Sequence, residues 1–185
     1  MPSSRSTGRS GIRAPNPREP DLSYDRYLVS DLLARPGSVD DVDVNVPLAM
    51  EFEQASIEAE ATGSLRLEAI SGGLLVRGDV RVPATLRCQR CLVEFDADIT
   101  ATITQLYGNA DDEEALPVSG DGRVDLAAPV RDELGMAVPL TPICRKDCKG
   151  LCATCGTDLN VQPCDGHEES SSSPFASLEG LFDPE

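Results

Sequence analysis

The sequence predicts an α+β fold: an antiparallel, meandering β-sheet or partial barrel, a few short helices, and a C-terminal cysteine-rich loop of the zinc-binding type. Three observations support this fold class. Several segments in the first hundred or so residues alternate apolar and polar side chains with period two. The clearest helical pattern comes after these segments rather than between them, so no βαβ unit is predicted. Five of the seven cysteines fall within residues 144–164.

The strand predictions rest on this alternation. The clearest segment covers residues 93–104, where apolar and polar side chains alternate for twelve positions. Such a pattern buries one face of an antiparallel strand and cannot bury one face of a helix. Residues 42–48, 65–69 and 74–82 alternate in the same way. Ser71-Gly72-Gly73 supplies a tight turn between the last two, which are therefore expected to form a hairpin.

Short helical segments are predicted at three places. The first covers residues 23–34, where apolar side chains recur every four residues ahead of Pro36-Gly37. Asp125 is placed to cap the second, with Pro129 tolerated in its first turn. The apolar face of this helix consists of Leu126, Val130 and Leu134. A third short amphipathic turn or helix follows Pro174.

These patterns predict one domain with two flanking tails. We expect residues 1–20 to be a disordered basic tail, residues 21–168 to be a single α+β domain, and residues 169–185 to be a serine linker with a short C-terminal helix. Within the domain, residues 109–122 are expected to be an acidic mobile loop and residues 143–167 a cysteine-rich metal loop.

The composition restricts the partners and the compartment. The chain carries 32 acidic and 16 basic residues, a formal net charge of −16, so it has no global attraction to nucleic acid or to anionic lipid. No apolar run is long enough to span a membrane, and the basic N-terminus lacks the apolar region of a secretory signal. We therefore expect a cytoplasmic protein, with no membrane partner, whose reduced cysteines serve metal or thiol chemistry.

Four cysteines within twelve residues, Cys144, Cys148, Cys152 and Cys155, predict a Zn²⁺ site, because tetrahedral zinc is usually held by thiolates. Cys152 and Cys155 form a Cys-x-x-Cys pair, and Gly156 directly after it lets the backbone fold under the Cys155 sulfur. The complete ligand set stays open at this point. The other candidate ligands are Cys164, His167, Cys88 and Cys91. Cys88 and Cys91 form a second Cys-x-x-Cys pair. For this pair, metal ligation and a reduced pair without a metal, at a strand-to-turn junction, are equal alternatives.

These motifs together resemble the YceD family, whose members are called large ribosomal RNA subunit accumulation proteins. The resemblance rests on Cys-x-Arg-Cys-Leu at residues 88–92 with Phe95 after it, an acidic spacer, an Asp-Leu helix, and Cys-x₃-Cys-Lys-Gly-Leu-Cys-x₂-Cys-Gly-x₂-Leu-Asn from Cys144. Arg35-Pro36-Gly37-Ser38 is similar to the actinobacterial form of the family. The resemblance covers about residues 22–182. It implies a non-enzymatic role in accumulation or processing of large-subunit (23S-type) ribosomal RNA, and hence in ribosome assembly in the bacterial cytoplasm.

No active site is predicted, so we expect a protein that is not an enzyme. His167 is the only histidine and stands beside a Ser/Glu-rich tail. The sequence has neither a phosphate-binding glycine loop nor a His-Glu-x-x-His motif. A thiolate-only ligand set with basic neighbours is typical of closed, structural zinc sites.

Four basic residues near the cysteines are candidates for contact with RNA or another partner: Arg87, Arg90, Lys146 and Lys149. The expected partners are large-subunit ribosomal RNA or a pre-ribosomal particle, with basic ribosomal proteins suited to the acidity of the chain. The alternative function is a cytosolic thiol-disulfide oxidoreductase or zinc-linked redox sensor that uses Cys88 and Cys91. Arg87 and Arg90 would promote thiolate formation there.

Overall fold

The computed structural model describes residues 26–108, 115–164 and 166–167. Three predicted segments lie outside the described residues: the basic tail of residues 1–20, the acidic first part of the 109–122 loop (residues 109–114), and the 169–185 linker and helix. The described chain forms seven strands and two helices. They are β1 (Arg26–Leu28), α1 (Ser30–Leu33), β2 (Val39–Glu51), β3 (Ala55–Ile70), β4 (Gly73–Arg87), β5 (Glu94–Gly108), β6 (Leu116–Pro117), β7 (Arg123–Asp125) and α2 (Ala127–Ala137).

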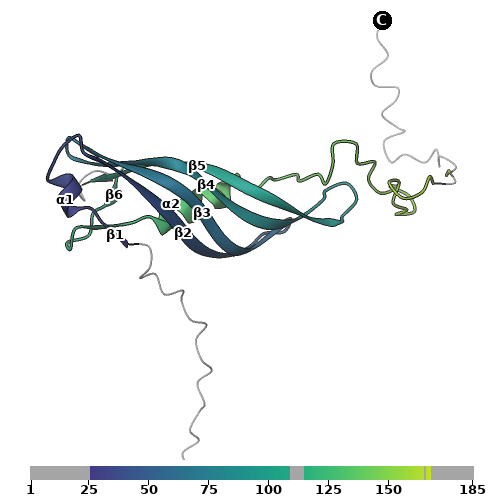
Figure 1. The fold of residues 1–185 in the computed structure, drawn as a ribbon. Coiled ribbons are helices and arrows are strands. Elements are labelled where there is room, and N and C mark those ends of the chain that lie inside the picture. Colours follow the sequence, from purple (N-terminus) through teal and green to yellow (C-terminus); the bar gives the residue numbers. More distant parts are fainter. Residues whose placement is uncertain (1–25, 109–114, 165, 168–185) are drawn as a thin grey trace, which may run out of the picture.

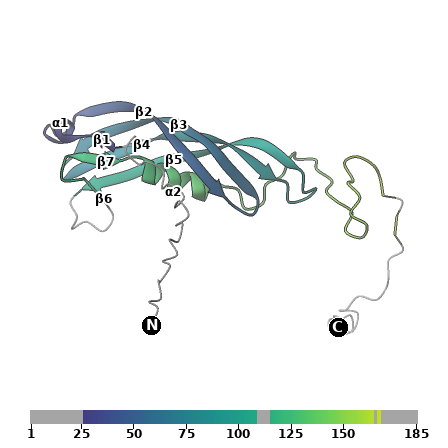
Figure 2. The same ribbon diagram turned by 90° about the horizontal axis from the view of Figure 1, so that it is seen from below.

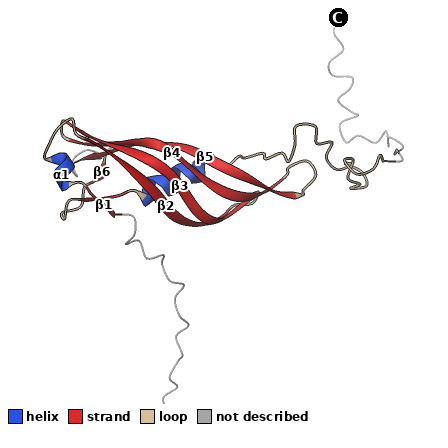
Figure 3. Cartoon of the chain, in the orientation of Figure 1, coloured by secondary structure: helices blue, strands red, loops and turns tan. Residues whose placement is uncertain are grey.

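The main sheet has the strand order β2-β3-β4-β5-β6. Strands β2 to β5 form an antiparallel meander, and the short β6 pairs in parallel with β5. Strands β1 and β7 form a separate two-stranded sheet at the end that carries α1 (Figures 1, 2 and 3; β7 is labelled in Figure 2). The long strands twist strongly and curve into a half-barrel, so the predicted α+β class with a meandering antiparallel core is confirmed.

The core lies between the concave face of the half-barrel and α2 (Figure 2). The alternation seen in the sequence sends every second side chain of β3, β4 and β5 into this core, where Leu65, Val76 and Ile103 are fully buried. Val130 and Leu134 of α2 pack against them and are also fully buried. The predicted apolar face of this helix therefore covers the sheet.

Asp125 caps α2 as predicted. Its Oδ1 accepts hydrogen bonds from the backbone N–H groups of Ala127 (2.9 Å) and Ala128 (3.2 Å). These donors belong to the first turn, where no intrahelical partner exists. Within the described residues, no helix has both the length and the apolar character needed to cross a membrane.

The structure differs from the sequence expectation in two short segments. Residues 26–28 of the predicted 23–34 helix form β1, because Tyr27 pairs with Val124 of β7, a partner almost a hundred residues away. Among the described residues of this segment, 26–34, Ser30–Leu33 alone is helical. In the predicted 109–122 loop, Leu116–Pro117 forms β6, since Tyr107 and Gly108 at the end of β5 offer it a free sheet edge.

Candidate metal centres

The two segments that carry all seven cysteines lie at the end of the half-barrel opposite α1 (Figure 1). Two segments meet there: the loop of residues 88–93 between β4 and β5, and the segment of residues 139–167 that follows α2. We call this region the cysteine end. Gln89 N–H donates to the Pro142 carbonyl (2.9 Å) and Leu151 N–H donates to the Arg90 carbonyl (3.0 Å), so backbone hydrogen bonds join the two segments.

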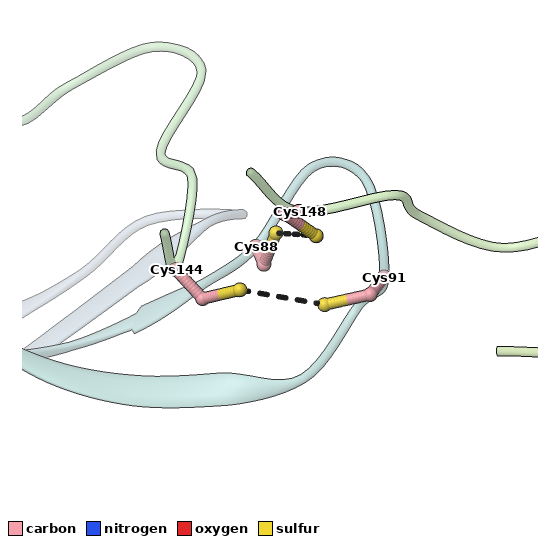
Figure 4. Close-up of side chains that lie close together, drawn as sticks. All are labelled: Cys88, Cys91, Cys144 and Cys148. Atoms are coloured by element: carbon pink, nitrogen blue, oxygen red, sulfur yellow. Dashed lines mark hydrogen bonds between the residues drawn. The ribbon is translucent and has the colours of Figure 1, made fainter. Parts of the chain in front are cut away.

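The first group, which we call the inner cluster, consists of Cys88, Cys91, Cys144 and Cys148 (Figure 4). Its four Sγ atoms lie within 4.8 Å of one another. Cys88 Sγ is 3.9 Å from Cys148 Sγ, and Cys91 Sγ is 3.7 Å from Cys144 Sγ. Three of the four residues are buried, and they form a small apolar cluster of their own with Phe95 and Leu151.

The sulfur separations in the inner cluster match a single tetrahedral zinc. With Zn–S bonds of about 2.3 Å, the sulfur–sulfur edge of a ZnS₄ tetrahedron is about 3.8 Å. A disulfide would bring two sulfurs to about 2.05 Å, and all seven cysteines are free thiols. The four side chains of the inner cluster therefore have the donor atoms and the spacing of a closed thiolate site.

The second group, which we call the outer cluster, consists of Cys152, Cys155, Cys164 and His167. Cys155 Sγ lies 3.7 Å from Cys164 Sγ. His167 Nε2 lies 3.0 Å from Cys164 Sγ and 3.3 Å from Cys152 Sγ. In contrast to the inner cluster, its members are exposed or half-buried.

Both Cys-x-x-Cys turns have the same backbone geometry. Leu92 N–H donates to the Cys88 carbonyl, and Gly156 N–H donates to the Cys152 carbonyl, each at 2.9 Å. Leu92 (φ 59°) and Gly156 (φ 72°) both adopt the left-handed conformation. A leucine there costs about 1–2 kcal/mol relative to a right-handed backbone, so the turn at residues 88–92 is held against local preference.

Hydrogen bonds favour a thiolate in each cluster. Burial opposes ionisation of Cys88, but hydrogen bonds from backbone groups at Cys144, Cys91 and Arg90 outweigh it and lower its pKa to about 6. Burial and the neighbouring Cys91 sulfur raise the pKa of Cys144 to about 12. In the outer cluster, the Thr157 hydroxyl lowers the pKa of Cys155 to about 6.

The structure divides the predicted zinc ligands between the two clusters. Cys144 and Cys148 join Cys88 and Cys91, while Cys152 and Cys155 join Cys164 and His167. The four residues chosen for their closeness in sequence therefore do not form one site, and all four alternative candidates take part in the grouping. Gly150 lies between the two pairs of cysteines, and its backbone is left-handed (φ 77°). It packs so closely on the Arg90 backbone that a Cβ there would lie 3.0 Å from the Arg90 carbonyl oxygen.

Two residues that contact the sulfurs are not among the candidate ligands that the sequence indicates, although Asn160 ends the quoted motif. Asn160 Nδ2 lies 3.5 Å from Cys148 Sγ, while its Oδ1 accepts a hydrogen bond from Lys149 N–H (2.8 Å). The Thr157 hydroxyl lies 3.1 Å from Cys155 Sγ. Thr157 comes directly after the Cys152–Gly156 turn and Asn160 three residues later, so their position after that turn is the signal in the sequence.

The four predicted contact residues all lie at the cysteine end. Arg87 pairs with Glu94 across the β4–β5 hairpin (3.9 Å). Arg90 Nη1 donates to the Cys148 carbonyl (2.9 Å), so Arg90 also joins the two segments. Lys146 and Lys149 are exposed, and neither makes an ion pair within the described part of the chain.

The redox alternative is not favoured by this geometry. Cys88 and Cys91 are 0% and 6% exposed, whereas reactive thiols lie in partly exposed positions. Each has its short sulfur contact with a cysteine of the other segment rather than with its partner in the Cys-x-x-Cys pair.

The fold and the two clusters define a class of protein: a half-barrel sheet with two cysteine clusters at one end. No solved structure matches the chain. The family model described as large ribosomal RNA subunit accumulation protein YceD matches residues 76–182, which contain both clusters. The chain belongs to the YceD family.

Its relatives include mycobacterial and plant proteins. An uncharacterized protein of Mycobacterium leprae is 30% identical over 91% of this chain and 85% of its own length. An uncharacterized protein of Mycobacterium tuberculosis is 31% identical over 85% of this chain and 81% of its own length. A large ribosomal RNA subunit accumulation protein YCED homolog 1, chloroplastic, from Zea mays is 28% identical over 50% of this chain and 28% of its own length.

Proposed function

We propose that this protein is a non-enzymatic ribosome-assembly factor of the bacterial cytoplasm that promotes accumulation or processing of large-subunit (23S-type) ribosomal RNA. The observation that carries the proposal is the YceD match over residues 76–182, together with the name of the plant relatives. The match includes β5 and α2 as well as the β4–β5 loop and the cysteine segment, so the cysteine end belongs to the part of the chain that the family shares.

In this proposal the inner cluster holds a structural Zn²⁺. Its four thiolates fill all four tetrahedral positions, so no position is left for a substrate or a reactive water. A closed site joins the β4–β5 loop to the segment after α2, two parts of the chain separated by 60 residues. Zinc thus fixes the surface at the cysteine end rather than performing a reaction.

The charge of the chain favours a pre-ribosomal particle over naked RNA as the partner. The net charge is −16, and a ZnS₄ centre adds about −2 to a region with only a few basic side chains. RNA alone would be repelled at long range. A particle that already carries basic ribosomal proteins offers positive charge to the acidic chain, while Lys146 and Lys149 make local contacts with RNA phosphates.

Depletion of the protein in its own bacterium is expected to lower mature large-subunit RNA relative to small-subunit RNA. The protein should sediment with large-subunit precursors in a gradient. Quantification of both RNAs, with immunodetection of the protein across the gradient, measures this. Normal RNA ratios together with a protein that stays at the top of the gradient would refute the proposed function.

The double variant Lys146→Gln/Lys149→Gln is expected to weaken association with the precursor particle roughly three- to tenfold, since each surface charge contributes up to about 1 kcal/mol. Arg77→Gln/Arg81→Gln is the matched control, because it also removes two charges, from exposed positions on β4 away from the cysteine end. Co-sedimentation at several salt concentrations measures both. Equal losses in the two variants would show that total charge, not the cysteine end, governs binding.

A further inference from the structure

We propose that the outer cluster is a second, separate zinc site, in which Cys152, Cys155, Cys164 and His167 hold one Zn²⁺ through three sulfurs and a histidine Nε2. The chain would then carry two zinc ions, one in each cluster. This inference concerns the metal content of the protein and does not depend on its role in ribosome assembly.

The first argument is the use of the donor residues. The chain contains seven cysteines and one histidine, and all eight residues are placed in the two clusters, four in each. Four is the number of ligands that a structural zinc requires. A chance grouping of reduced thiols gives no reason for the single histidine to complete the second set of four.

The second argument is the geometry of the donor atoms. The four ligand atoms of the outer cluster lie within 4.8 Å of one another. The Cys155–Cys164 separation of 3.7 Å equals the edge expected around zinc, about 3.8 Å. The sulfur–Nε2 separations of 3.0 and 3.3 Å are shorter than the value of about 3.6 Å expected for a tetrahedral Zn(S)(N) edge, so the imidazole would move outward by a few tenths of an ångström to hold the ion.

The third argument is that the outer cluster repeats the turn of the inner one. Cys152–Gly156 has the same 2.9 Å closing hydrogen bond and the same left-handed fifth residue as Cys88–Leu92. Each turn presents two sulfurs to one side. The inner turn is completed by a Cys-x₃-Cys pair and the outer turn by Cys164 and His167, so each turn has its own second pair of ligands.

The fourth argument is that turn hydrogen bonds, but no apolar core, support this segment. None of the described residues between Cys152 and His167 is buried, so no apolar core supports the turns. A short segment without a core needs a cross-link or a metal to be ordered. The cysteines are free thiols, which leaves the metal.

The test is the zinc content of the full-length protein, purified with a reductant and without chelator, by native mass spectrometry and elemental analysis. We expect about two zinc ions per chain. Cys164→Ser/His167→Gln should halve this to one, and Thr154→Ala/Gln162→Ala, which changes two exposed residues of the same segment, should leave it at two. Co²⁺ in place of the remaining zinc should keep the absorption of a tetrahedral thiolate site.

The zinc content distinguishes a chain with both sites from a chain with the inner site alone. One zinc ion in the parent that is unaffected by Cys164→Ser/His167→Gln would overturn the outer site and leave the inner site and the proposed function intact. Iron in place of zinc, with the visible absorption of an iron–sulfur centre, would overturn the assignment as well. Circular dichroism of the double variant guards against unfolding: an intact β spectrum with one zinc lost supports a local, independent site.

Discussion

Cys148→Ser is expected to release the inner zinc and to free the segment after α2 from the sheet. Cys148 is 3% exposed, and its Sγ faces Cys88 while its carbonyl receives the Arg90 side chain. A serine hydroxyl is a poor zinc ligand, and the other three thiols would be left without the ion that holds them together. Zinc content should fall by one ion per chain.

The expected loss of stability follows from the length of the loop that the zinc closes. Cys88 and Cys148 are 60 residues apart. A covalent cross-link over such a distance stabilises a fold by about 4 kcal/mol on the chain-entropy estimate, and a zinc bridge constrains the unfolded chain in the same way. We expect a loss of at least about 3 kcal/mol in Cys148→Ser, which thermal or denaturant unfolding would measure.

The control is Cys155→Ser, which removes a ligand of the outer cluster only. Cys155 is exposed and lies within residues 152–167, where no described residue is buried, so the sheet should keep its stability in this variant. Hydrogen exchange should separate the two: faster exchange at residues 88–93 in Cys148→Ser and unchanged exchange there in Cys155→Ser. The same unfolding temperature and zinc content in Cys148→Ser as in the parent would rule out a structural inner zinc.

The sheet could be predicted from the sequence because its signal is local. Alternation from Val93 onward requires no knowledge of the rest of the chain. The strand predicted for residues 93–104 is found as β5, which continues as far as Gly108. The 23–34 segment shows the opposite case. Its apolar spacing suits a helix, yet Tyr27 pairs with Val124, and no local pattern contains that partner.

The metal clusters show the same limit for function. The cysteine residues themselves were evident, but their grouping depends on which segments the half-barrel brings together. The β4–β5 turn places Cys88 and Cys91 at the end of the sheet, and α2 returns the chain to that end at Cys144. Cys148 and Cys152 belong to different clusters, although only three residues lie between them. One of these three is the left-handed Gly150. Sequence distance is therefore a poor guide to which of these side chains lie together.

A second large effect is expected at Gly78, where β3 and β4 approach closely. A Cβ at this position would lie less than 3.0 Å from the Ser64 backbone carbonyl oxygen and 2.9 Å from Leu65 Cδ2. A carbonyl in the β3–β4 ladder cannot move without breaking its pairing. The side chain would also point toward the core side of β4, between Val76 and Val80.

Gly78→Ala should therefore destabilise the protein by about 2–3 kcal/mol, the cost of overpacking a site that cannot relax. That corresponds to a fall of roughly 5–10 °C in Tm for a domain of this size. Gly120→Ala is the matched control, because a Cβ there meets no atom within 4 Å and its backbone is not left-handed. Differential scanning calorimetry of both variants is the measurement. Equal Tm values would mean that β3 can move away from β4 at little cost. The half-barrel would then not require a residue without a Cβ at position 78.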